Sequence, residues 1–162
     1  MCTTQELAAI ADAFQRLLQK SKKLDSTTVF EGTQFVIEDT ALKRVVWACA
    51  SEPGLDSYAL DPRLTIPSAK LLGSLEMDQL ICQAHFKLPG DGVDFKWHQD
   101  SEHRRYGSDL WTDLNQKGSF VQTIMAIDEM DRDNSPIMAI PYSHLEGHLA
   151  LNEDDNRSRY VN

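Results

Sequence analysis

The chain has 162 residues, of which 41% are hydrophobic and 25% are charged, and its formal net charge is -9 at pH 7. This mixture is typical of one globular domain, and the acidic balance argues against a nucleic-acid partner, because such binding needs cations that neutralise phosphates. No run approaches the roughly 18 apolar residues of a membrane-spanning helix, so no membrane partner is expected.

The N-terminus and the cysteines indicate a reducing compartment. The first residues lack the basic start and apolar core of a signal peptide. The three cysteines, Cys2, Cys49 and Cys82, are widely spaced and form no Cys-x-x-Cys motif. We therefore predict a cytoplasmic protein whose thiols are reduced.

Helical patterns come first along the chain. Apolar residues recur at helical spacing through the first 20 residues, and Thr3 with Glu6 has the form of a capping box. These features predict a helix over residues 4–20. The following segment, residues 28–38, is ambiguous, and its apolar residues could form a strand.

Two further helices are predicted before residue 75. One begins after Thr40, which serves as its N-cap, and is ended by Pro53-Gly54. The other covers residues 67–72, because proline suits a first helical turn and Gly73 suits the position just past the end. Residues 1–75 are therefore expected to be mainly helical. The apolar stripe of the first of these helices consists of Leu42, Val45, Val46 and Cys49.

Residues 76–150 are predicted to be rich in strands, because the sequence changes there to an alternation with a period of two. This alternation is clearest in residues 80–87. The polar face of that strand carries Gln83, His85 and Lys87. The opposite face carries Leu80, Cys82, Ala84 and Phe86.

Three more strands are predicted, over residues 95–100, 120–128 and 137–143. The last two are separated by a turn-forming cluster at residues 131–134. Helices followed by strands indicate a single α+β domain that spans the chain and is built around an antiparallel sheet. Residues 151–162 are predicted to be a polar tail.

The tripeptide from His98 to Asp100 is the strongest candidate for a metal site. At the end of a strand, its imidazole and carboxylate lie on the same side of the backbone. They correspond to two of the three ligands in the 2-His-1-carboxylate triad of non-haem Fe(II) enzymes. Such a tripeptide alone is more often a hydrogen-bonded surface pair. The flanking aromatic residues Phe95 and Trp97, and the preceding strand with a polar face, favour the metal site.

Other chemistries fit the sequence less well. A calcium loop that starts at Asp131 would need glycine at its sixth position and glutamate at its twelfth, where the chain has Pro136 and Tyr142. No cysteine or histidine pairs have the spacing of a zinc site. Ser143-His144 lacks the glycines of a nucleophile elbow, which argues against a serine hydrolase.

Seven motifs follow one another in a characteristic order between about residues 60 and 150. They occupy residues 70–73, 83–90, 95–100, 121–128, 133–137, 140–144 and 147–148. Together they resemble the phytanoyl-CoA dioxygenase family. The resemblance implies N-terminal helices packed on a double-stranded β-helix, a jelly-roll-like barrel, which would be partial in this chain.

The resemblance also implies cofactors and site residues. His98 and Asp100 would bind Fe(II), 2-oxoglutarate and O2 would be co-substrates, and Gln83 and Ile124 would line the co-substrate pocket. The carboxylate of Asp100 favours hydroxylation over halogenation, because related halogenases have a small residue at this position.

Two family features are not evident after Asp100. The resemblance implies a third iron ligand in a later histidine motif, followed by an arginine that binds the far carboxylate of 2-oxoglutarate. The downstream histidines are His144, which the motif places in a turn, and His148. We therefore expect one of three cases: a piece of a longer enzyme, a protomer completed by a partner, or a sheet covered by its own helices. Unpaired sheet edges would favour self-association.

Two functions remain open. The leading hypothesis is a dioxygenase that uses Fe(II) and 2-oxoglutarate to hydroxylate a small-molecule or acyl substrate, with release of succinate and CO2. The alternative is a catalytically inactive remnant of the same fold that serves as a binding or interaction module. The substrate itself is not indicated by the sequence.

Overall fold

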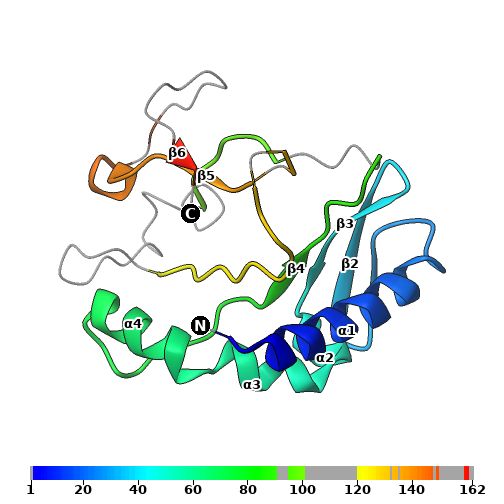
Figure 1. Cartoon of the computed structure of the whole chain (residues 1–162), viewed down its shortest axis with the longest axis horizontal. Coiled ribbons are helices and arrows are strands. Elements are labelled where there is room, and N and C mark those ends of the chain that lie inside the picture. Colours follow the sequence, from blue (N-terminus) through cyan, green and yellow to red (C-terminus); the bar gives the residue numbers. More distant parts are fainter. Residues whose placement is uncertain are drawn as a thin grey trace. The chain divides into compact units, whose positions relative to one another are not determined.

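The computed structural model forms two compact units (Figure 1). The first comprises Met1–Lys70 and Ser74–Asp94, and the second comprises Leu71–Gly73 and Phe95–Asn162. The single domain expected for the whole chain stays a prediction. The structure describes residues 2–90, 95–100, 120–131, 133–134, 136–147 and 149, together with the backbone of residues 159–160.

Helix α1 (Thr4–Ser21) opens the first unit and confirms the prediction from the capping box. The Thr3 hydroxyl accepts a hydrogen bond from the Glu6 N–H at 3.2 Å, and the Glu6 carboxylate accepts one from the Thr3 N–H at 2.6 Å. These bonds satisfy two backbone donors that the first helical turn leaves without partners. The buried residues of the helix are Ile10, Ala13, Leu17, Leu18 and Ser21.

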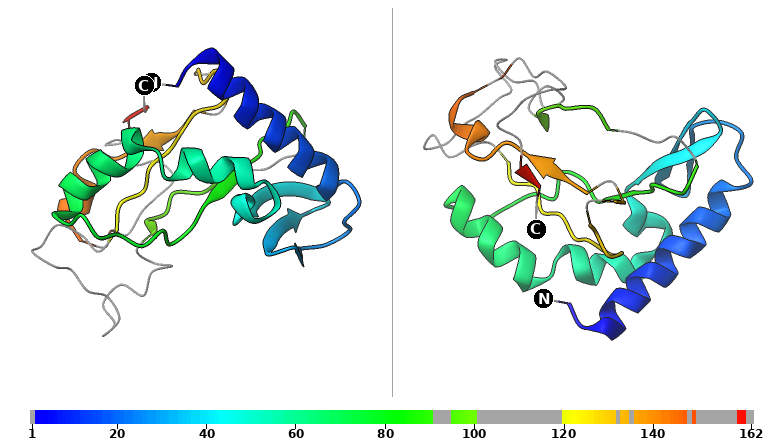
Figure 2. Two further views of the ribbon diagram at one scale, coloured as in Figure 1. Left: turned by 90° about the horizontal axis from the view of Figure 1, so that it is seen from below. Right: turned by 45° about the horizontal axis from the view of Figure 1, so that its top comes forward.

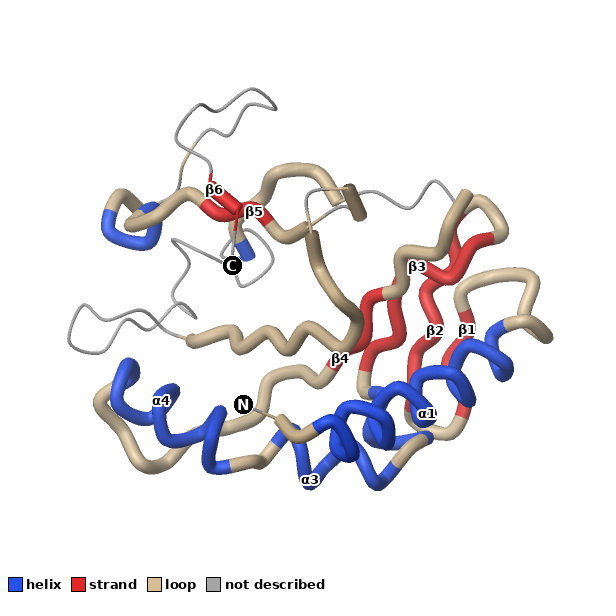
Figure 3. The backbone as a smooth tube through the Cα atoms, in the orientation of Figure 1, coloured by secondary structure: helices blue, strands red, loops and turns tan. Residues whose placement is uncertain are grey.

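The first unit contains a four-stranded antiparallel sheet in the order β1-β2-β3-β4 (Figure 3). The ambiguous segment before residue 38 forms two of these strands, so the first 75 residues mix helices and strands. The strands are β1 (Thr28–Phe30), β2 (Thr33–Glu38), β3 (Ala41–Val46) and β4 (Gln83–His85).

Both hairpin turns of the sheet place two successive residues in the left-handed region. Glu31 and Gly32, between β1 and β2, have φ of 51° and 79°. Asp39 and Thr40, between β2 and β3, have φ of 49° and 68°. Two-residue turns of this kind match the twist of antiparallel strands, although the β-branched Thr40 is strained there.

The helix predicted to follow Thr40 is wrong, because residues 41–46 form β3. The register between β2 and β3 skips Lys43, so this residue is an extra one in its strand. Such a bulge reverses the twofold alternation, and it brings Leu42 and Val45 to buried positions at a spacing of three. Apolar residues three positions apart are also typical of the buried face of a helix, which explains the wrong prediction.

Short helices connect β3 to the longer helix α4 (Pro62–Leu72). The sequence predicts a later start for α4, at Pro67. It begins earlier because the Asp61 carboxylate accepts the Arg63 N–H at 2.7 Å and Pro62 suits the first position. Gly73 has φ 69° just past the end of α4, as predicted. The connecting elements are α2 (Ala48–Ser51), η1 (Pro53–Leu55) and α3 (Asp56–Ala59).

The core of the first unit lies between α1 and the sheet. Helix α1 lies beside the sheet and contacts β3 (Figure 2). Leu17, Phe35 and Val45 are completely buried there. The rings of Phe14 and Phe86 pack at a centroid distance of 5.9 Å, so the chain just after β4 also contacts α1.

The second unit contains less regular structure in its described residues. Strands β5 (Met138–Ala139) and β6 (Arg159–Tyr160) pair antiparallel, and η4 (Ser143–Leu145) is a short 3-10 helix. The strands predicted over residues 95–100 and 120–128 are wrong, since both segments are irregular. The molecule therefore has α+β architecture with an open antiparallel sheet, and a jelly-roll barrel is not confirmed.

The turn predicted at residues 131–134 is confirmed. The Asp131 carboxylate accepts hydrogen bonds from the N–H groups of Asp133 at 2.8 Å and Asn134 at 3.1 Å. The Asn134 amide donates to the Glu129 carbonyl at 2.6 Å, which closes the loop.

None of the helices in the described part of the chain is long and apolar enough to cross a membrane.

Candidate functional site

His98 and Asp100 lie close together, although the segment that carries them is not a strand. His98 Nε2 is 3.4 Å from Asp100 Oδ1. The two side chains are 46% and 29% exposed, so they stay open to small ligands. The structure therefore brings together the two residues that the sequence predicts as metal ligands.

The backbone orients the His98 imidazole. Its Nδ1 is 2.6 Å from the Lys96 carbonyl oxygen. Because a carbonyl can only accept a hydrogen bond, this contact assigns the proton of a neutral imidazole to Nδ1. The lone pair of Nε2 then lies on the side of Asp100. Metal-binding histidines commonly hold their second nitrogen in this way.

Two acceptors that face each other form a suitable site for a cation. First-row metals bind imidazole nitrogen and carboxylate oxygen at about 2.1 Å, and two such ligands of one ion are then about 3.0–3.4 Å apart. The 3.4 Å between His98 Nε2 and Asp100 Oδ1 fits this range. A doubly protonated imidazole would instead form an ion pair with the carboxylate. We call these two atoms the two-ligand corner.

A complete triad is not present in the described residues, where no three histidine, cysteine, aspartate or glutamate side chains form a metal-binding group. His144 lies on η4 and is exposed. His148, the other downstream candidate, is outside the described residues. The two-ligand corner is thus the part of the expected site that the described residues supply.

Gln99, between His98 and Asp100, anchors the motif to a distant segment. Its side-chain amide donates to the Gly147 carbonyl at 3.0 Å and its oxygen accepts the Leu149 N–H at 2.6 Å. The amide thereby pairs with the backbone as a neighbouring strand would. The sequence does not indicate this role, because a single glutamine carries no pattern. We call these two bonds the Gln99 clamp.

The two residues predicted to line a co-substrate pocket have different surroundings. Gln83 begins β4, where its backbone pairs with Val46 of β3, and it is half-buried. Ala84 and Phe86 are buried, as the expected alternation predicts, but Leu80 of the same predicted face is 53% exposed and β4 covers only Gln83–His85. Ile124 lies in an irregular segment of the second unit and is 60% exposed. Their role in co-substrate binding stays a prediction.

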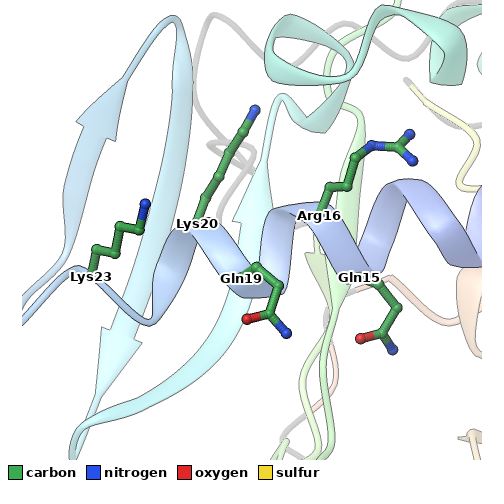
Figure 4. Close-up of a pocket in the computed structure, with 5 residues that line it drawn as sticks. All are labelled: Gln15, Arg16, Gln19, Lys20 and Lys23. Carbon is green, nitrogen blue, oxygen red and sulfur yellow. The ribbon is translucent and has the colours of Figure 1, made fainter.

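A shallow hollow on α1 does not supply a metal site. Arg16 donates to the Glu52 carboxylate at 2.9 Å and 3.0 Å, and Lys20 lies 3.6 Å from it. These cations therefore hold α1 against the chain that follows α2. The hollow contains neither imidazole nor carboxylate in its lining, which consists of Gln15, Arg16, Gln19, Lys20 and Lys23 (Figure 4).

Comparison with known families gives a match over nearly the whole chain. Residues 1–159 match the family model described as Phytanoyl-CoA dioxygenase (PhyH). The match extends beyond residues 60–150, where the sequence motifs lie, and includes α1 and the strands β1 to β3. No curated protein and no solved structure matches the chain.

Proposed function

Because the chain belongs to the phytanoyl-CoA dioxygenase family, we propose that it is an oxygenase that depends on Fe(II) and 2-oxoglutarate. It hydroxylates a small-molecule or acyl substrate with O2 and releases succinate and CO2. The observation that carries this proposal is the two-ligand corner, in which His98 Nε2 and Asp100 Oδ1 are 3.4 Å apart. Members of this family generally use Fe(II) and 2-oxoglutarate.

His98 and Asp100 would hold Fe(II), which when bound supplies the site at which 2-oxoglutarate and O2 react. The Lys96 carbonyl keeps the His98 proton on Nδ1, so that Nε2 remains a ligand. Asp100 contributes one negative charge to a divalent cation. Beside such a cation, Asp100 would leave a net positive charge that suits a dianionic co-substrate. The Gln99 clamp fixes the backbone between the two ligands.

The remaining parts of the site are also proposals. Gln83 and Ile124 line the pocket for 2-oxoglutarate. The third ligand is supplied by residues outside the described ones, which include His148, or by another copy of the chain, because His144 does not join His98 and Asp100 in a metal-binding group. Pairing between copies has a suitable place at β1, an end strand of the sheet in which Val29 and Phe30 are 67% and 49% exposed.

An inactive remnant that serves as a binding module is the second candidate. It is favoured by the described residues, which contain two of the three expected ligands and no three-residue metal-binding group. A chain of this kind keeps the family fold but does not bind iron stably. The two candidates differ in whether 2-oxoglutarate is consumed.

The test is succinate formation by the full chain with Fe(II), 2-oxoglutarate and O2 under reducing conditions. The proposal expects succinate from the wild type and its loss in His98→Ala and Asp100→Ala. Asp12→Ala, which removes an exposed carboxylate from α1, is the matched control and keeps the activity. No succinate from the wild type would favour the remnant. Loss of Fe(II) binding in His148→Ala would identify the third ligand.

A further inference from the structure

Two of the three cysteines meet in the first unit. Cys49 Sγ is 2.9 Å from Cys82 Sγ, although the residues are 33 positions apart in the sequence. Cys49 lies on α2 and is buried, whereas Cys82 directly precedes β4 and is partly exposed. Both are free thiols in the structure. This pair does not contribute to the two-ligand corner.

Hydrogen bonds that do not involve the thiols hold the two cysteines near each other. The buried Thr33 hydroxyl donates to the Trp47 carbonyl at 2.9 Å and accepts the Ser51 N–H at 3.0 Å, which fixes both ends of the α2 turn. The Ala48 N–H donates to the Cys82 carbonyl at 3.2 Å and joins the two segments directly. The thiols are therefore kept in proximity by the fold.

The contact makes the two thiols chemically different. The Cys49 thiol donates its hydrogen to Cys82 Sγ, and this bond lowers the pKa of Cys82 to about 7 against the opposing effects of burial and the Asp56 carboxylate. The same bond, reinforced by burial, raises the pKa of Cys49. At pH 7 about half of the Cys82 thiols are therefore ionised, while Cys49 keeps its proton. A thiolate is the nucleophilic form of cysteine.

We propose that Cys49 and Cys82 are a reversible oxidation site that hydrogen peroxide converts to a disulfide. Cys82 thiolate attacks one peroxide oxygen, the O–O bond breaks, and the hydroxide that leaves takes a proton to become water. Cys49 sulfur then attacks the Cys82 sulfenic acid, the S–O bond breaks, and the hydroxide leaves as water with the Cys49 proton. Two thiols lose two electrons, and one peroxide becomes two waters.

The geometry favours this step over reaction with other thiols. A disulfide has an S–S distance of about 2.05 Å, so the sulfur atoms need to approach by about 0.9 Å from their separation of 2.9 Å. The new bond would join α2 to the residue before Gln83, at the start of β4. The proposal is independent of the proposed oxygenase activity, because neither cysteine belongs to the expected iron site.

The main test is to treat the reduced full chain with one equivalent of hydrogen peroxide, then block the remaining thiols and map the peptides by mass spectrometry. We expect a Cys49–Cys82 linked peptide as the main product, Cys2 still reduced, and full reversal by dithiothreitol. The same treatment in denaturant is the control, and there the preference for this pair disappears. A folded protein that yields no such linked peptide would overturn the proposal.

Variants test the separate roles of the two sulfur atoms. In Cys49→Ser, Cys82 sulfenic acid accumulates and is trapped by dimedone, whereas Cys2→Ser forms the disulfide like the wild type. Half of a thiol with a pKa of about 7 is ionised at pH 7, against about 3% of free cysteine. After correction for its lower nucleophilicity, Cys82 should react about three times faster than free cysteine. Equal dimedone labelling of Cys2 and Cys82 in Cys49→Ser would contradict the assignment of Cys82 as the more reactive thiol.

Discussion

Gln99→Ala removes both bonds of the Gln99 clamp while leaving the side chains of His98 and Asp100 in place. Each hydrogen bond contributes about 0.5–1.5 kcal/mol, so the bonds at 3.0 Å and 2.6 Å together contribute about 1–3 kcal/mol to the local closed state. Exchange of the Leu149 amide hydrogen through local opening should therefore accelerate about 5-fold to 150-fold. If the clamp positions His98 and Asp100, the affinity for Fe(II) also falls, by about 10-fold to 100-fold.

Amide hydrogen exchange and anaerobic Fe(II) titration of the same samples measure these two effects. Gln99→Glu is the matched variant, because it keeps an oxygen that accepts the Leu149 N–H but loses the donor to the Gly147 carbonyl. Protection of the Leu149 amide should survive in this variant. Unchanged exchange in Gln99→Ala would refute the clamp. Faster exchange with unchanged Fe(II) affinity would show that the clamp does not position the ligands.

Three predictions concern the stability of the first unit. Thr33→Val should lower the free energy of unfolding in urea by about 2–3 kcal/mol, because the Trp47 carbonyl and the Ser51 N–H lose their partner. Thr33→Ser keeps the hydroxyl and should retain most of the wild-type stability. Leu17→Ala should cost about 2–5 kcal/mol, since Leu17 is completely buried, and a loss below 1 kcal/mol would contradict the assigned core. Arg63 lowers the pKa values of Glu6 and Asp61 to about 2. The ionised carboxylates therefore stabilise the folded state above the usual carboxyl pKa near 4, and this stabilisation is lost as the pH falls toward 2. In Glu6→Gln, the free energy of unfolding, followed by circular dichroism, should therefore fall less steeply as the pH drops from about 4 to 2.

Local signals in the sequence were sufficient for several elements. The capping box at Thr3 and Glu6 identified the start of α1, because the two residues satisfy backbone donors within one turn. The turn at residues 131–134 was found for the same reason, since Asp131 and Asn134 bond to nearby backbone. These contacts need no information from the rest of the chain.

Elements that depend on pairing between strands were harder to predict. The bulge at Lys43 gave β3 the spacing of a helix, and it arises only when β3 pairs with β2. Conversely, His98 and Asp100 were expected to meet because of a strand, yet they meet in an irregular segment. Their position two residues apart was enough for contact.

The contacts between distant segments could not be predicted from one sequence. Gln99 bonds to backbone groups about 50 residues away, and Cys49 meets Cys82 across 33 positions. Neither arrangement leaves a periodic pattern or a spacing motif. The sequence predicted reduced cysteines from their wide separation, but the fold brings two of them together.

The central claim is that His98 and Asp100 bind iron together with 2-oxoglutarate. An anaerobic titration of the reduced full chain with Fe(II) and 2-oxoglutarate tests it most directly, because the bound pair gives a visible charge-transfer absorbance. We expect this band in the wild type and in Asp12→Ala, and its loss in His98→Ala and in Asp100→Ala. A wild-type chain without the band, or a band that survives in both variants, would contradict the assignment.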